Sequence, residues 1–259
     1  MTTTIHLATF SGASSLPLFV AIEMGHFAAH GLEVELTKVK NSDQLMTGLL
    51  DGSFEIAHSA PDNFIAWRDR TSTDIVAWIG GAGGPLELVA APGIDRLDGL
   101  RGRTIAVDSP ESGFVSTLRL ILRAGGLAED DVTLEALGST QLRYQALLAG
   151  KTSATMLTLP WSLLAVEAGC SVVGDQASVL PRLQGSCGAS LATWLRANPE
   201  IADAYLRALV AALTDLYTGS LPEADVRRML SDRYGIEERH VEVIRRAFVD
   251  PVVGWPPSG

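Results

Sequence analysis

The chain has 259 residues, of which 47% are hydrophobic and 19% charged, and its formal net charge is −10. This balance is typical of a globular protein and excludes a disordered or fibrous chain. Nucleic acids and acidic membranes call for patches of lysine and arginine, so the charge argues against those partners, although a few local donors would still bind a small anion. The two cysteines, Cys170 and Cys187, have no paired histidines nearby, and we expect no metal or other cofactor.

The first stretch combines a strand, a polar loop and a helix. A short apolar strand over 5–10 leads into the loop 11–15, and Pro17 then opens a helix that we expect to end near Gly31. The free N–H groups of the first helical turn, with the hydroxyls of Ser11, Ser14 and Ser15, suit an anion or polar ligand. The alternative is a plain strand-to-helix turn, which serine and glycine also favour.

Strands and helices alternate along most of the remaining chain. In the first series we expect strands at 32–39, 54–59, 74–81 and 86–91, a helix capped by Ser42 that ends at Gly52, and a helix at 61–70. The second series has strands at 104–109, 132–137, 153–158 and 171–175, with helices between them. A strand at 188–193 and helices at 198–217, 222–234 and 237–248 follow.

This order predicts two mostly parallel sheets covered by helices. The helical tail is too long for the second series alone, so we expect the second lobe to be inserted into the first. Lobe 1 would then comprise 1–90 and 188–259, and lobe 2 would comprise 91–187, with crossings near 88–92 and 185–191. A cleft between two such lobes is a common ligand site that closes about a hinge.

Four stretches carry a resemblance to a known family. They are SLPLFVAIEMGHFAAHGLEVEL, LMTGLLDGSFEIAHSAPDN, LDGLRGRTIAVDSPESGFVSTLRLILRAGGLAEDDVTL and YQALLAGKTSATMLTLPWSLLAVEAG. In order and spacing they resemble the type II periplasmic solute-binding proteins, in the branch that serves sulfonate, nitrate, taurine and thiamine-pyrimidine uptake. The resemblance implies a two-lobed Venus-flytrap fold, a ligand bound by the cleft loops, and an ABC transporter permease as a partner.

The start of the chain bears on localisation. The first four residues, MTTT, lead straight into the first strand, without the basic and apolar regions of a signal peptide, and no apolar run would span a bilayer. We expect a cytoplasmic protein if Met1 is the native start, and otherwise a periplasmic or cell-surface protein whose signal was removed. Some relatives on this fold are cytoplasmic metal-free enzymes, so the missing signal favours an enzyme as the alternative.

Several loops at strand ends hold candidate ligand-binding residues. His58 could exchange a proton near neutral pH, with Asp62 to orient it, or it could simply hydrogen-bond ligand or backbone. Ser112 and the N–H groups of Gly113 and Phe114 could bind an oxyanion, or form an ordinary helix start. Trp161 could stack on a flat ligand or pack inside the lobe. The further candidates are Ser59, Gly83, Ser109 and Pro160.

Two hypotheses for function follow. In the first, the chain closes around a small polar or anionic organic molecule as the solute-binding protein of an ABC-type uptake system. In the second, it is a cytoplasmic metal-free enzyme, a decarboxylase or lyase of a small organic acid, with His58 as its acid and base.

Overall fold

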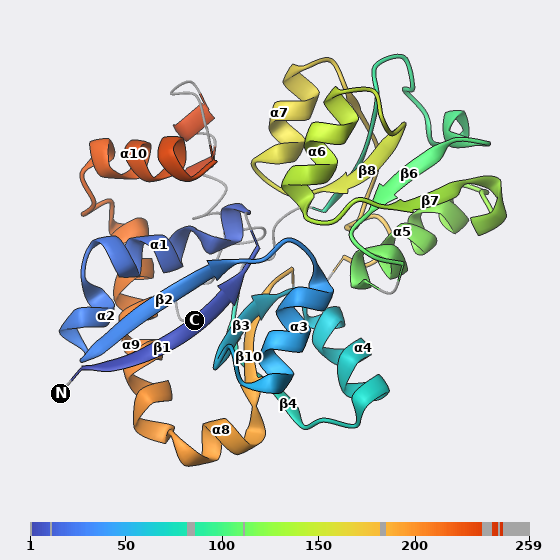
Figure 1. Ribbon diagram of the computed structural model, residues 1–259. Helices are drawn as coiled ribbons and strands as arrows, with labels where there is room; N and C mark the ends of the chain where they lie inside the picture. The colour runs from blue at the N-terminus through green and yellow to red at the C-terminus, as the bar shows by residue number, and fades with distance from the viewer. Residues whose placement is uncertain are drawn as a thin grey trace.

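The computed structural model describes residues 2–10, 12–81, 86–110, 112–181, 185–234, 240–242 and 244–245. They form two lobes, each built on a five-stranded sheet (Figure 1). The first sheet has the order β2 (Leu32–Lys38), β1 (Thr3–Thr9), β3 (Ile56–Ser59), β10 (Cys187–Leu191) and β4 (Ile75–Gly80). The second has the order β7 (Thr133–Ala136), β6 (Thr104–Val107), β8 (Ala154–Leu157), β5 (Glu87–Ala90) and β9 (Ser171–Asp175).

Each sheet contains one strand that runs against its neighbours. β10 is antiparallel to β3 and β4, and β5 is antiparallel to β8 and β9, whereas β1 and β6 pair in parallel with both of their neighbours. The expected two-lobed α/β fold with mostly parallel sheets is therefore confirmed. Because β10 lies between β3 and β4, the strands from β5 to β9 form an insertion into the first sheet.

The crossing between the lobes differs from the expected one. Residues 87–90 form β5 in the second sheet, so the chain crosses before Glu87 and not near 88–92. The residues Leu88, Val89 and Ala90 are fully buried, and a strand buried in this way needs a paired strand on both edges. Its apolar sequence does not say which sheet supplies those strands. At the return crossing, Cys187 already belongs to β10 of the first sheet.

Seven helices and a short 3₁₀ turn surround the first sheet in the described chain. They are η1 (Ala13–Ser15), α1 (Leu16–Glu23), α2 (His26–Ala29), α3 (Ser42–Asp51), α4 (Pro61–Thr71), α8 (Ala192–Ala197), α9 (Pro199–Thr218) and α10 (Glu223–Tyr234). The single helix expected up to Gly31 is divided into α1 and α2, because Gly25 adopts a left-handed φ of 76°. Asn41, and not Ser42, caps α3, since its side chain accepts a hydrogen bond from the Gln44 N–H.

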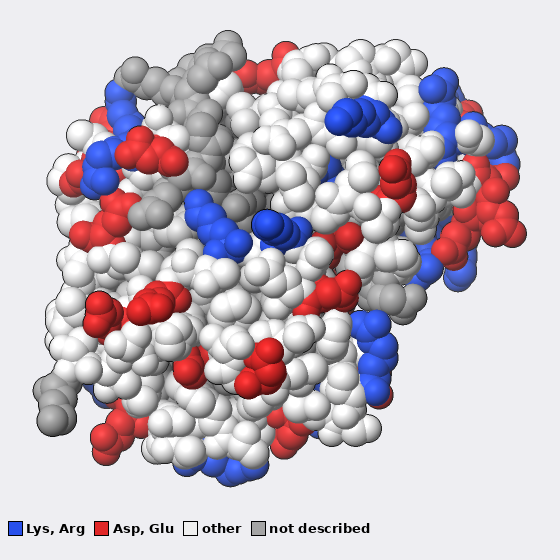
Figure 2. All heavy atoms as spheres, in the orientation of Figure 1, with Lys and Arg blue, Asp and Glu red and all other residues white. Residues whose placement is uncertain are grey.

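Lobe 2 has three α-helices and two 3₁₀ turns among its described residues. They are η2 (Leu97–Leu100), α5 (Gly113–Ala124), η3 (Glu129–Asp131), α6 (Thr140–Leu148) and α7 (Trp161–Glu167). Among all helices that the structure describes, none is long and apolar enough to cross a membrane. Lysine, arginine and acidic side chains are interspersed over the face in Figure 2, with no single large basic patch on it.

The apolar core links the two lobes. The largest buried cluster includes Phe19 of α1 in lobe 1 and Trp161 and Ala165 of α7 in lobe 2. A second cluster lies within lobe 2, where Leu118 and Ile121 of α5 pack against the sheet. Burial of apolar surface on this scale is the main stabilising term in folding, so the two lobes are held against each other by the same effect that holds each lobe together.

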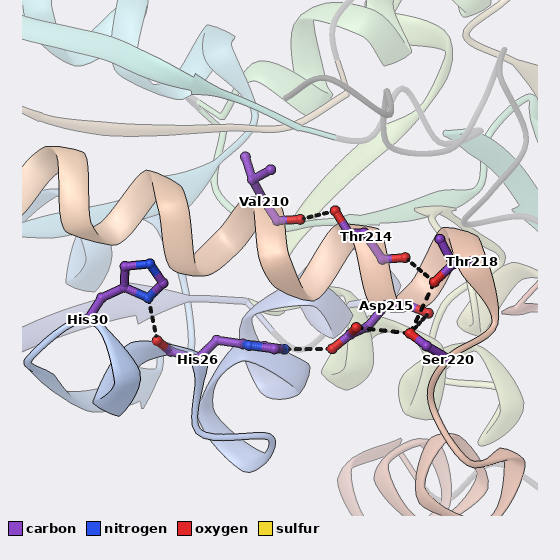
Figure 3. Close-up of polar contacts among 7 residues, drawn as sticks. All are labelled: His26, His30, Val210, Thr214, Asp215, Thr218 and Ser220. Carbon is purple, nitrogen blue, oxygen red and sulfur yellow. Dashed lines mark hydrogen bonds and ion pairs between the residues drawn. The ribbon is translucent and has the colours of Figure 1, made fainter.

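A polar contact fixes α2 to α9 (Figure 3). The Nε2 atom of His26 lies 2.7 Å from Oδ2 of Asp215, and Ser220 donates a hydrogen bond of 2.9 Å to Oδ1 of the same carboxylate. Asp215 stands between the histidine and the serine, whereas nucleophilic catalysis requires the histidine to contact the serine. The contact therefore joins α2 to the end of α9 and forms no catalytic pair.

Candidate functional site

The loops that follow the parallel strands of the two sheets meet between the lobes. The hydroxyl of Ser42, at the start of α3, donates a short hydrogen bond to Oδ2 of Asp108, which directly follows β6. A side chain carbon built on Gly138, after β7, would lie 3.0 Å from the carbonyl oxygen of Lys40, after β2. In α/β proteins the carboxyl ends of strands are the usual place for ligands, and here those ends face each other.

Asn63 is the centre of a buried hydrogen-bond network at this interface. Its Nδ2 atom donates to the hydroxyls of Ser59 at 2.8 Å and of Ser42 at 3.1 Å. Its Oδ1 atom faces the N–H of Gly113, at the start of α5 in lobe 2, across 3.5 Å. Through Ser42 the network continues to Asp108. Polar side chains from α3, α4 and β3 of lobe 1 are thus joined to both β6 and α5 of lobe 2.

Two buried polar atoms of lobe 2 at this interface have unused hydrogen-bonding capacity. Asp108 is 8% exposed and Ser112 is 4% exposed, and within the described part of the chain neither Oδ1 of Asp108 nor Oγ of Ser112 has a hydrogen-bond partner. At least nine-tenths of buried polar groups in proteins are paired. A ligand or water held between the lobes would supply the missing partners.

Arg143 of α6 supports the lobe 2 side of the interface. Its guanidinium is buried and donates to the Thr155 and Thr140 hydroxyls and to the carbonyls of Gly138 and Met156. Burial lowers its pKa to about 10, which the charge of Asp108 partly offsets, so Arg143 stays protonated at neutral pH. It balances the charge of Asp108, and its bonds tie the loop after β7 and the start of α6 to β8.

Asp62 lies where α4 meets α5. A side chain carbon built on Gly113 would lie 1.8 Å from Cγ of Asp62, so a larger residue there would force the carboxylate to move. The Asp62 carboxylate also accepts a 2.9 Å hydrogen bond from the N–H of Asn63 in its own helix. Burial raises its pKa, and the hydrogen bond from Asn63 partly offsets that rise. The carboxylate therefore occupies the first turn of α4 and borders the first turn of α5.

The first loop has a more local role than the sequence predicts. Ser15 is buried, and its hydroxyl lies 2.8 Å from that of Thr9 and donates to the carbonyl of Phe10 at 2.9 Å, so it stabilises the turn. Ser14 is half-buried. A side chain carbon on Gly12 would lie 3.9 Å from the hydroxyl of Thr158, so this loop also faces lobe 2. Two further candidates, Ser11 and Gly83, lie outside the described residues.

His58 is buried inside lobe 1. It is 6% exposed, and its Nε2 atom lies 2.8 Å from the hydroxyl of Tyr205 in α9. Burial lowers its pKa to about 4, so the ring is neutral at pH 7. Tyr205 in turn contacts the rings of Phe27 and Trp78. This environment is that of a core histidine that hydrogen-bonds the side chain of Tyr205, which neither sequence-based interpretation of His58 named.

The remaining candidate residues of lobe 2 differ in their burial and in the groups that they contact. Pro160 and Trp161 are buried, and the Trp161 ring packs at 5.2 Å from that of Tyr144, as expected for a core tryptophan. The carbonyl of Ser109 accepts a hydrogen bond from the Ser112 N–H. Phe114 is half-buried, with the Arg143 guanidinium 5.9 Å from its ring centre.

Cys187 is not an activated thiol. Burial and the nearby charge of Asp62 raise its pKa to about 12, so it is protonated at neutral pH. Within the described residues there is no group of three or more histidine, cysteine, aspartate or glutamate side chains that could hold a metal ion.

Four residues of the interface were not among the candidates predicted from the sequence. These are Ser42, Asn63, Asp108 and Arg143. Asp108 directly follows a buried strand, the same signal that singled out Ser109, and Asn63 adjoins the candidate Asp62. Ser42 has the sequence pattern of a helix cap, and an arginine within a helix, such as Arg143, usually faces solvent. The sequence therefore did not indicate the tertiary partner of either residue.

Comparisons with known proteins identify the fold. The NMT1-like family matches residues 1–224 of this chain. A protein from Bordetella bronchiseptica RB50 is 19% identical, with a TM-score of 0.81 over 99% of this chain and 84% of that one. The alkanesulfonate-binding protein SsuA from Xanthomonas axonopodis pv. citri, bound to MOPS, is 16% identical, with a TM-score of 0.80 over 98% and 86%.

The periplasmic nitrate-binding protein NrtA from Synechocystis PCC 6803 is 19% identical, with a TM-score of 0.73 over 89% of this chain and 66% of that one. The comparison with curated protein sequences gives no match. The family match and these structures confirm the resemblance to the type II periplasmic binding superfamily.

Proposed function

This chain belongs to the NMT1-like family, and we propose that it binds a small polar organic molecule between its two lobes as the solute-binding component of an ABC-type uptake system. The permease of that system would be its protein partner. The related structures support this proposal, since SsuA is an alkanesulfonate-binding protein and NrtA a periplasmic nitrate-binding protein.

The proposal rests on the unused polar atoms between the lobes. Oδ1 of Asp108 and Oγ of Ser112 are buried without a partner in the described chain, at the carboxyl ends of strands that face the other lobe. A buried polar group without a partner destabilises a protein by about 1–3 kcal/mol. A ligand that bonds to both atoms would remove this penalty and favour the arrangement in which the lobes touch.

No described contact supports the enzyme as a second proposal. It depended on His58 as acid and base, and the structure surrounds this ring with the core of lobe 1 and lowers its pKa to about 4. A general base for neutral pH needs a pKa near 7 and access to the substrate.

A thermal-shift screen over sugars, amino acids, amines and organic acids tests the proposal. A ligand at one hundred times its Kd stabilises the folded state by about 2.7 kcal/mol, a readily measured rise in Tm. Ser112→Ala should weaken the response to the best ligand, while Ser116→Ala, at an exposed position of the same helix, should not. No response to any class, or an equal loss in both variants, would reject binding at this interface.

A further inference from the structure

We infer that the ligand enters this site with an N–H-rich, positively charged group, such as an ammonium or an amidinium, and not with an oxyanion. The inference rests on the proposed function and specifies its ligand class. It depends on two aspartates, Asp62 of lobe 1 and Asp108 of lobe 2, that approach the interface from opposite sides.

Asp62 fills the place where an oxyanion would bind. The start of a helix attracts anions through its free N–H groups and its dipole. At the start of α5, however, the Asp62 carboxylate lies against Gly113, and the Asn63 carbonyl oxygen faces the Gly113 N–H. A second anion beside Asp62 would be repelled, because like charges at close range in a partly buried site repel each other.

Asp108 supplies an acceptor that still needs a donor. Oδ2 accepts the hydrogen bond from Ser42 across the interface, which shows that the carboxylate points toward lobe 1. Oδ1 is buried and has no hydrogen-bond partner in the described chain. A carboxylate oxygen only accepts hydrogen bonds, so its partner must donate one. The nearby hydroxyl of Ser112 would accept or donate and therefore tolerates such a group.

The buried cation of this region does not offset both aspartates. Arg143 already directs N–H groups to two hydroxyls and two carbonyls of lobe 2, and it balances Asp108 alone. Lys40, after β2, is exposed, so solvent and salt screen its charge. Asp62 and Asp108 thus place two carboxylates against the single buried guanidinium of Arg143, an arrangement that is complementary to a cationic donor.

Matched ligand pairs test this inference. Benzamidine and benzoate share a ring, and ethylamine and ethanesulfonate share an ethyl group, so each pair differs mainly in its charged group. Both members are titrated at millimolar concentration, with Tm and calorimetric binding as readouts. We expect the cation of a pair to bind and its anion not to. Asp108→Asn should weaken binding of the cation roughly tenfold, because a charged acceptor forms a stronger hydrogen bond than a neutral one.

Two variants distinguish binding by the aspartates of the site from a general attraction between the ligand and the negatively charged protein. Glu33→Gln removes one negative charge from an exposed position of β2 and should leave binding of the cation unchanged. Asp62→Ala removes both the charge and the group that fills the start of α5, so it should weaken binding of the cation and allow ethanesulfonate to bind. Preference for the anion in the unchanged protein, or no response to any pair, would overturn the charge assignment. The broad screen, which includes neutral solutes, would then still decide separately whether the interface binds a ligand at all.

Discussion

Gly113→Ala should separate the two lobes. The new methyl group would lie 1.8 Å from Cγ of Asp62, so the carboxylate must turn away or α4 and α5 must move apart. Overpacking of this kind destabilises proteins by about 1–3 kcal/mol. The backbone of Gly113 does not explain such a loss: its φ is not among the positive values, and alanine is the better helix former by up to about 1 kcal/mol.

The assays are urea unfolding for stability and small-angle X-ray scattering for the separation of the lobes. We expect a lower free energy of unfolding and a larger radius of gyration. Gly48→Ala is the matched control, because its methyl group would meet the Phe54 ring at 2.3 Å within lobe 1 alone. It should lower stability without moving the lobes apart. Adding Asp62→Ala to Gly113→Ala should restore the compact form, and an unchanged radius in Gly113→Ala would refute the reasoning.

Three further predictions concern single side chains. His58 has a pKa of about 4 in the folded protein against 6.5 in the unfolded chain, so its contribution to the free energy of unfolding is complete above pH 6.5. As the pH falls toward 4 that contribution is lost, by at most about 3 kcal/mol, and His58→Gln should flatten this loss in urea melts across the same range. Asp62, with a raised pKa, changes stability in the opposite direction in both proteins. Ser42→Ala removes a donor from the buried Asp108 carboxylate and should lower stability by about 1–3 kcal/mol, and a loss near zero would show that water replaces the hydroxyl. His26→Ala, at a partly exposed ion pair, should change the free energy of unfolding by less than about 1 kcal/mol, and a larger loss would mean that the end of α9 depends on this contact.

The sequence predicted the two-sheet architecture because the periodicity of strands and helices is local. The periodicity does not predict which sheet a single apolar strand such as β5 joins, because residues 87–90 have the same pattern whether they pair in the first sheet or the second. The division between α1 and α2 was also missed. Gly25 was visible in the sequence, but glycine within a helical pattern does not by itself require a left-handed φ.

The sequence indicates which loops lie between the lobes, but not what each side chain in those loops does. Strand ends pointed to loops that meet between the lobes, where Ser59 bonds to Asn63 and the Asp62 carboxylate lies against Gly113. Whether a polar side chain in such a loop faces the interface, as Asp62 does, or turns inward is decided by tertiary packing. Thr9 and Phe10 draw the Ser15 hydroxyl inward, and local sequence does not reveal that choice.

The polar contacts between the lobes also limit what kind of ligand would drive closure. To move a two-state equilibrium from 1:99 to 99:1, a ligand must favour one state by about 5.5 kcal/mol. Each unpaired buried group, Oδ1 of Asp108 and Oγ of Ser112, destabilises the closed arrangement by about 1–3 kcal/mol. A ligand that satisfies only one of them falls short of that requirement. A ligand that reaches both, with a donor for the carboxylate, comes close to it, so closure would depend on the same two atoms that select the ligand.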